Sequence, residues 1–203
     1  MSLDNTAGHW GPVAKGLHWA ITLLVFVQVP FGFYAHKQKQ DMIAAVDMSR
    51  IEDVVAIFDL HKSIGIVIAL FVIARIIWRV THYVPPLSGE LPRFVQLLAH
   101  TTHGALYAVL LILPISGYVI SAGSHIEIDF FYLFHIPNFI SVSESTRHVA
   151  EAVHLVCVWM LILLTVLHVG AAAFHHYALK DDTLVKMWPA FLGGRGGPAR
   201  PAG

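Results

Sequence analysis

Charged residues are scarce in this chain of 203 residues: Lys, Arg, Asp and Glu together make up 13 %, against 56 % hydrophobic residues. A soluble domain of this length covers its surface with about 25 % charged residues. Half that share indicates that lipid replaces water around much of the protein. The formal net charge is zero, so the sequence lacks the basic excess typical of a nucleic-acid-binding protein.

Cysteine is almost absent, since Cys157 is the only one. This excludes an internal disulfide and a cluster of thiolate metal ligands. Cys157 lies inside an apolar run, where we expect it to pack as a small hydrophobic side chain. The first apolar stretch has no small-residue cleavage site after it and is interrupted by Gln-Val-Pro. We therefore expect a retained helix there and no cleavable signal peptide.

Long apolar runs, by contrast, are abundant in this sequence. Four stretches reach the roughly 20 residues that a helix needs to cross a bilayer. They cover residues 16–34, 61–80, 96–120 and 148–177. A polar loop is expected over residues 36–59, a proline-rich turn over 83–92, a third loop over 121–147 and a flexible tail over 193–203. We predict a single all-α membrane domain, residues 1–203, built as a four-helix bundle.

The loops also predict an orientation. The side that holds both termini and the second connection carries eight of the 13 basic residues, and the other side carries five basic residues against nine acids. Basic residues are retained on the cytoplasmic side of bacterial membranes. We therefore expect both termini in the cytoplasm.

Histidine is unusually common, with 14 residues against 13 Lys and Arg. His154 and His168 lie 14 residues apart in the fourth stretch, so they share one helix face and are separated by about 21 Å along its axis. His18 opens the first stretch at the depth of His168, and His61 opens the second at the depth of His154. The topology therefore predicts two pairs, each able to bind a six-coordinate haem iron from two helices.

Other interpretations of these histidines have to be compared with this one. A single histidine at a helix end is usually an interfacial hydrogen-bonding group. Zinc also binds neutral imidazole, but it needs four ligands around one point, whereas these pairs lie far apart. A histidine-lined transporter for metal ions or protons remains a further alternative, which the absorption spectrum of b-type haem would distinguish.

Two arginines and two further histidines accompany the pairs. Arg75 lies 14 residues after His61, where a propionate of the inner haem would offset the cost of its charge; an anchoring role at the cytoplasmic interface is equally compatible. Arg79 is expected either to bind the same propionate or to reach the lipid headgroups. His100 and His103 are candidates for a quinone site or a proton path, or for the inner ligand in place of His18.

Four segments resemble the helices of the bacterial cytochrome b561 family. They are KGLHWAITLLV, LHKSIGIVIALFVIARIIWRVTHYVPP, AHTTHGALYAVLLILPISGY and EAVHLVCVWMLILLTVLHVGAAAFHHYALKDDTLVKMWP. The resemblance runs over about residues 12–189, in the same order. It implies a four-helix protein of the bacterial inner membrane with two haems b, and it carries over His18, His61, His154 and His168 as axial ligands. The chain departs from the shortest members in its longer first outer loop and in its tail.

The resemblance also implies electron transfer to ubiquinone. Our leading hypothesis is an enzyme, a superoxide:ubiquinone oxidoreductase that oxidises superoxide at the outer haem and reduces ubiquinone near the cytoplasmic face. Four basic residues of the outer side would steer the anion, namely Lys37, Lys39, Lys62 and Arg147. The nine acids on that side oppose such steering. The alternative is a cytochrome subunit that receives electrons from a partner dehydrogenase or a soluble cytochrome.

Overall fold

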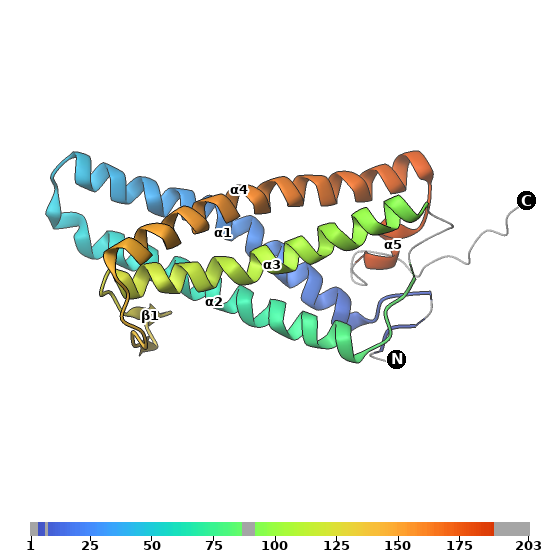
Figure 1. Ribbon diagram of the computed structural model, residues 1–203, viewed down its shortest axis with the longest axis horizontal. Coiled ribbons are helices and arrows are strands. Elements are labelled where there is room, and N and C mark those ends of the chain that lie inside the picture. Colours follow the sequence, from blue (N-terminus) through green and yellow to red (C-terminus); the bar gives the residue numbers. More distant parts are fainter. Residues whose placement is uncertain (1–3, 7, 87–91, 189–203) are drawn as a thin grey trace, which may run out of the picture.

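Four long helices lying side by side make up most of the computed structural model (Figure 1), which describes residues 4–6, 8–86 and 92–188. They are α1 (Pro12–Ala44), α2 (Ile51–Thr81), α3 (Arg93–Gly123) and α4 (Glu144–Phe174). Each is long and apolar enough to cross a membrane. The predicted all-α membrane bundle is confirmed, and each predicted span lies within one long helix or, for the fourth, within α4 and the π-helical turn η2 (His175–Leu179) that continues it.

The first residues of the helices explain where they begin. Pro12 occupies the first turn of α1, where its fixed φ suits a helix and its missing N–H has no partner to lose. The hydroxyl of Ser143 accepts a hydrogen bond from the Thr146 N–H at 3.2 Å, and Glu144 places a negative charge in the first turn of α4. Glu52 and Asp53 play the same electrostatic role in α2.

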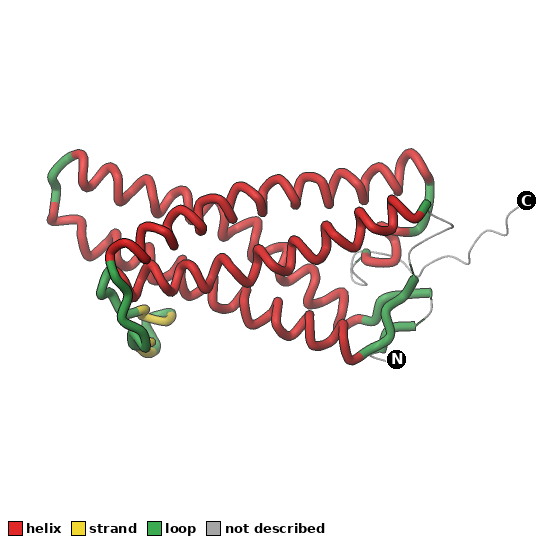
Figure 2. Tube along the Cα trace, in the orientation of Figure 1, coloured by secondary structure: helices red, strands yellow, loops and turns green. Residues whose placement is uncertain are grey.

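The expectation of a polar loop over residues 36–59 was wrong. The helix α1 continues to Ala44, α2 begins at Ile51, and only a short connection with the 3-10 turn η1 (Met48–Arg50) separates them. Figure 2 shows this helical hairpin extending past the ends of α3 and α4. Polarity ends a membrane span but does not end a helix, because Lys, Gln, Ala and Met all favour helix formation. An ion pair between Lys37 and Asp41 supports the extension.

Helix packing is uneven across the bundle. The backbones approach closely between α1 and α2, between α3 and α4, and between α2 and α3, whereas α4 has no extended close approach to α1 or α2 in the described part of the chain. The buried core lies at mid-depth and consists of Ile21, Ile68, Val72, Val109, Leu110, Cys157 and Leu161. Cys157 is thus a buried hydrophobic side chain, as expected. Many large apolar side chains point outward, as lipid contact requires.

A small hairpin, β1 (Ile128–Phe130) and β2 (Phe134–Ile136), covers the start of α2. We label this end of the bundle the outer end and the end that carries the start of α1 the inner end. It is attached through Ser63, which is fully buried: the Phe131 N–H donates to Ser63 Oγ at 3.0 Å, and the Ser63 hydroxyl donates to the Asp59 carbonyl at 2.7 Å. The Tyr132 hydroxyl adds a bond to the carbonyl of Ala56 at 3.1 Å. The third connection is therefore fixed to the bundle rather than free.

The start of α1 and the end of the described chain meet at the opposite end of the bundle. The Trp19 Nε1–H donates to the carbonyl of Met187, the last residue of the short helix α5 (Thr183–Met187), at 2.8 Å. This end and the N-terminal end of α3 lie on one side of the molecule (Figure 1). The predicted tail, residues 193–203, lies outside the described residues.

The Ser63 attachment predicts a local effect on dynamics. Replacing Ser63 with alanine removes the acceptor of the Phe131 N–H, which costs about 1 kcal/mol and should speed exchange of that amide roughly fivefold. Hydrogen–deuterium exchange measured by mass spectrometry tests this. Ser49→Ala removes an exposed hydroxyl from the same end of the protein and should leave that amide unchanged. Equal exchange in the wild type and in Ser63→Ala would contradict the attachment.

Candidate functional site

Three imidazoles gather at the inner end of the bundle. The rings of His18 on α1 and His168 on α4 have centroids 6.1 Å apart, with their planes at 73°. His103 on α3 lies beside them, with its ring centroid 5.2 Å from that of His168, and its Nδ1 donates to the carbonyl of Ala99 at 2.7 Å. Neither His18 nor His168 makes a side-chain hydrogen bond within the described residues. The predicted inner pair is thus brought together, with His103 as a third neighbour.

The outer level is built around His61 and His154. The His61 ring lies against Gly32 of α1, so closely that a Cβ at Gly32 would come within 2.8 Å of its Cε1 atom. The His154 ring lies against Gly117 of α3 and bonds through Nδ1 to the hydroxyl of Ser116 at 2.9 Å. His61 and His154 are close enough for an electrostatic interaction between them. Glycine at position 32 leaves the His61 ring space that a Cβ would fill, whereas a Cβ at Gly117 would make an ordinary van der Waals contact with the His154 ring.

The two arginines have protein partners. Arg75 Nε donates to the hydroxyl of Tyr107 at 3.1 Å, and its Nη1 donates to the carbonyl of Ala14. Its charge also acts on His18 and His168. Arg79 lies over the ring of Trp10, with its Cζ 5.6 Å from the ring centroid. Arg75 therefore links three helices beside the inner imidazoles, whereas Arg79 packs at the edge of the bundle.

Sequence reasoning missed a partly buried histidine–aspartate pair after the end of α4. In the π-helical turn η2, His175 Nδ1 lies 2.5 Å from an Asp181 carboxylate oxygen. Burial raises the pKa of Asp181, but hydrogen bonds from His175 and Thr183 outweigh it and hold that pKa below its ordinary value. Lys180, with φ of 55°, reverses the chain between them. By contrast, His100 is exposed on α3 and joins no histidine cluster in the part of the chain that the structure describes.

The inner pair has the dimensions of a bis-imidazole iron site. Two imidazoles that bind one metal from opposite sides, each at about 2 Å, have ring centroids about 6 Å apart. The observed 6.1 Å matches this spacing. At the outer level, His61 Nδ1 is buried without a hydrogen-bond partner. An unpaired polar atom in an apolar interior is costly, so the ring is held in place for a reason other than protein hydrogen bonding.

The donor set does not suit zinc. Within the described residues, no group of three or more His, Cys, Asp or Glu side chains is arranged to hold a metal ion. A closed structural zinc site needs four such ligands. In the described part of the chain, α4 has no extended close approach to α1 or α2. Pairs of imidazoles from these facing helices suit a flat macrocycle that brings its own four nitrogens.

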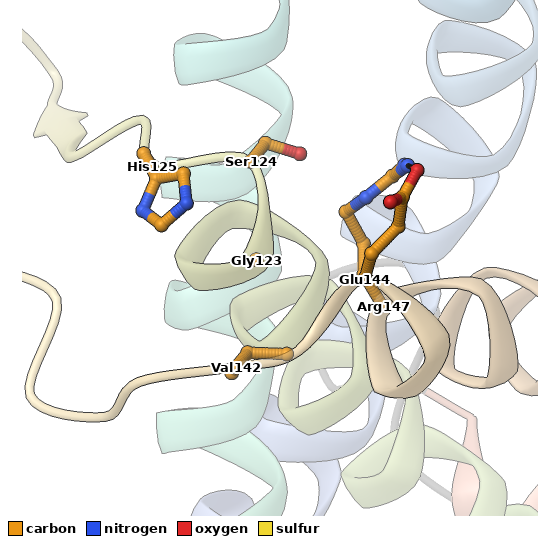
Figure 3. A pocket seen from close by; sticks show the side chains of 6 residues that line it. All are labelled: Gly123, Ser124, His125, Val142, Glu144 and Arg147. Carbon is orange, nitrogen blue, oxygen red and sulfur yellow. Dashed lines mark ion pairs between the residues drawn. The ribbon is translucent and has the colours of Figure 1, made fainter.

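A shallow pocket opens at the outer end of α3 and α4 (Figure 3). Its lining is Gly123, Ser124, His125, Val142, Glu144 and Arg147. Arg147 is bound by Glu151, with Nη1 to Oε1 at 2.5 Å, and has Glu144 at 3.8 Å. The guanidinium charge in this pocket is therefore already compensated by two carboxylates.

The sequence matches known proteins over nearly the whole chain. Residues 9–190 match the family model described as prokaryotic cytochrome b561. The chain belongs to the prokaryotic cytochrome b561 family. It is 31 % identical to cytochrome b561 homolog 2 of Escherichia coli (strain K12) over 200 residues, covering 92 % of this chain and 95 % of that protein. It is 27 % identical to a probable superoxide oxidase, CybB, of Yersinia pestis over 177 residues, covering 86 % and 92 %.

A third relative is cytochrome b561 homolog 1 of Escherichia coli (strain K12), 28 % identical over 129 residues, which cover 64 % of this chain and 73 % of that protein. Family membership establishes a multi-pass bacterial membrane cytochrome that binds haem b and transfers electrons. The predicted family, fold class and type of cofactor are thereby confirmed.

The contact between Gly32 and His61 predicts a selective effect on haem binding. In Gly32→Ala the new methyl group would stand 2.8 Å from His61 Cε1, so the ring must move. We expect a lower ratio of haem to protein in the purified variant, measured by the pyridine haemochrome assay. Gly16→Ala is the control, because a Cβ at that position of α1 meets nothing within 4 Å. Equal haem content in both variants would show that the ring position does not matter.

Proposed function

We propose that the chain carries electrons across the inner membrane by means of two haems b. His18 and His168 would hold the inner one, and His61 and His154 the outer one. When bound, each haem supplies a one-electron carrier. The observation that carries the proposal is the 6.1 Å spacing of the His18 and His168 rings, together with the absence of hydrogen bonds to either ring in the described chain. The polypeptide contributes ligands, orientation and an apolar surrounding.

Arg75 is our candidate for a contact with a propionate of the inner haem. Its Nη2 makes no hydrogen bond within the described residues, while Nε and Nη1 are engaged. The two existing bonds hold the guanidinium beside His18 and His168. Arg79 is the second candidate for this role, from its position one turn later in α2.

The direction of transfer follows from an orientation that we also propose, with both termini in the cytoplasm. The start of α1, the end of α2 and the start of α3 lie at one end of the bundle, which carries six basic residues in the described part of the chain. The opposite end carries nine acids against five basic residues. The bias toward basic residues supports placing the first end inside. The histidine pair His61 and His154 would then lie near the outer face.

The reaction we propose is oxidation of superoxide outside, coupled to ubiquinone reduction inside. Two superoxide anions each release one electron and become O₂, and one ubiquinone takes up both electrons with two protons from the cytoplasmic side. The 27 % identity to the probable superoxide oxidase supports this choice over a generic electron carrier. We place the quinone and its proton path beside His103 and His100, at the inner end of α3.

One observation favours a second candidate, a cationic soluble redox protein as donor. On the outer side, Lys37, Lys62 and Arg147 each pair with a carboxylate. Nine acids and five basic residues leave an excess of four negative charges there. Such a surface attracts a positively charged protein and weakly repels an anion.

The assignment of ligands predicts which haem each variant loses. His154→Ala should lose the outer haem and keep the inner one, and His168→Ala should do the reverse, because each removes one of two axial bonds. Haem-to-protein ratios and redox titration of the remaining haem measure this. The exposed His100→Ala should keep both haems. Wild-type haem content in His154→Ala or His168→Ala would overturn the pairing.

The same assay separates His18 from His103 as the partner of His168. Loss of the inner haem is expected in His18→Ala, because the 6.1 Å spacing belongs to that pair and the His103 ring lies closer, at 5.2 Å. His103→Ala should retain the inner haem. The opposite result would transfer the ligand role to His103.

The choice of donor predicts opposite responses to salt. If superoxide is the donor, pulses of it should reduce the haem faster than the background dismutation, with turnover when a ubiquinone analogue is added. Because the outer side is net negative, higher ionic strength should then raise the rate constant. Pulse radiolysis at several salt concentrations measures it.

Failure of superoxide to reduce the haem would remove the superoxide proposal while leaving electron transfer intact. A basic cytochrome c used as a test donor distinguishes the second candidate. Its rate of haem reduction should fall with salt, because screening weakens the attraction between opposite charges.

A further inference from the structure

A short hydrogen-bond chain joins α4 to α3 at the outer level. His154 Nδ1 lies 2.9 Å from Ser116 Oγ, and the Ser116 hydroxyl donates to the carbonyl of Leu113 at 2.9 Å. Ser116 is only 5 % exposed, so water does not compete for these bonds. Leu113 and Ser116 lie within one turn of α3, whereas His154 lies on α4, 38 residues after Ser116 in the sequence.

The Ser116 hydroxyl lies within hydrogen-bond distance of both the Leu113 carbonyl and His154 Nδ1. A hydroxyl has one proton, and a carbonyl only accepts. With that proton donated to Leu113, Ser116 Oγ accepts from His154, and the ring proton lies on Nδ1. Nε2 is left with its lone pair, the form of imidazole that binds a metal.

Packing fixes the ring orientation as well. A Cβ at Gly117, the residue after Ser116, would lie 3.7 Å from His154 Cε1 and 3.9 Å from its Nδ1, so the ring edge rests on the surface of α3. His61, across the bundle, has no counterpart, since its Nδ1 is buried without a partner. The two outer imidazoles are therefore unequal.

We propose that Ser116 is a positioning residue for His154, selecting the Nδ1–H tautomer and making His154 the stronger electron donor of the outer pair. The proposal rests on the proposed role of His154 as an axial ligand. Metal-binding histidines commonly donate their second N–H to an acceptor, which orients the ring and increases its basicity. A more basic ligand stabilises ferric iron, so the Ser116 bond should lower the midpoint potential of the outer haem.

The test compares Ser116→Val with Ser116→Thr in the haem-loaded protein. Both side chains are β-branched and similar in shape, but only threonine keeps the hydroxyl, so their difference reports the hydrogen bond and not the packing. Redox titration should give a higher outer-haem potential in the valine variant than in the threonine variant, with equal inner-haem potentials. The low-spin ferric signal of the outer haem in electron paramagnetic resonance should shift in the same variant alone.

If the added methyl group prevents assembly of both variants, Ser116→Ala is compared with Ser121→Ala. Ser121 is also buried on α3, but its hydroxyl bonds to the Ile126 carbonyl and to no imidazole. Only Ser116→Ala should then raise the outer-haem potential.

Equal outer potentials in the valine and threonine variants, or a shift of both haems together, would overturn the role of Ser116. The ligand assignment fails separately: if His154→Ala keeps both haems, His154 is not a ligand. Loss of the outer haem in His154→Ala without any difference between valine and threonine would reject the Ser116 proposal alone.

Discussion

The nitrogens of a histidine ring inside an apolar helix bundle need a hydrogen-bond partner or a metal ion. The arrangement of helices and histidines in this protein follows from that requirement. A polar group buried without a hydrogen bond costs roughly 2–7 kcal/mol, depending on the reference state. His154 and His103 are satisfied by the protein, through Ser116 and the Ala99 carbonyl. The rings of His18 and His168 make no hydrogen bond within the described residues, and His61 Nδ1 is buried without one. The coordination of haem iron that we propose would give these rings a partner, and family membership supports haem as the cofactor.

The uneven helix packing serves the same requirement. α1 pairs closely with α2, α3 pairs closely with α4, and α2 also contacts α3, whereas α4 has no extended close approach to α1 or α2 in the described part of the chain. His168 of α4 faces His18 of α1 across this separation. Gly32 lets the His61 ring lie directly on α1, and the His154 ring lies against α3 beside Gly117. Ring position is thus determined by backbone, which moves less than side chains do. A scaffold of this kind holds a cofactor in nearly one geometry through cycles of reduction and oxidation.

The sequence predicted the features that repeat along a helix and missed those that join distant positions. Apolar runs located the four spans, and the 14-residue separation of His154 and His168 located the two depths. The helical extension beyond Tyr34 was missed because hydropathy reports contact with lipid, whereas helix formation depends on backbone propensity. The bond of His154 to Ser116 was missed because sequence periodicity does not predict which side chains of neighbouring helices meet. The bond of His175 to Asp181 was missed because it forms across a reversal of the chain, where no periodic pattern holds.

The charges near the two depths differ, and this difference bears on the direction of electron transfer. Arg75 sits beside His18 and His168 with two neutral partners, so its positive charge remains uncompensated by protein groups in the described chain. Near His61, by contrast, Lys62 is neutralised by the buried Asp59 at 3.0 Å. A positive charge beside one site in an apolar medium stabilises an added electron there more than at a distant site. If the two histidine pairs hold haems as proposed, Arg75 would offset the negative charge of an inner-haem propionate, which lowers the cost of adding an electron at the inner level. Inward transfer would then follow from a fixed charge, with no movement of the helices required.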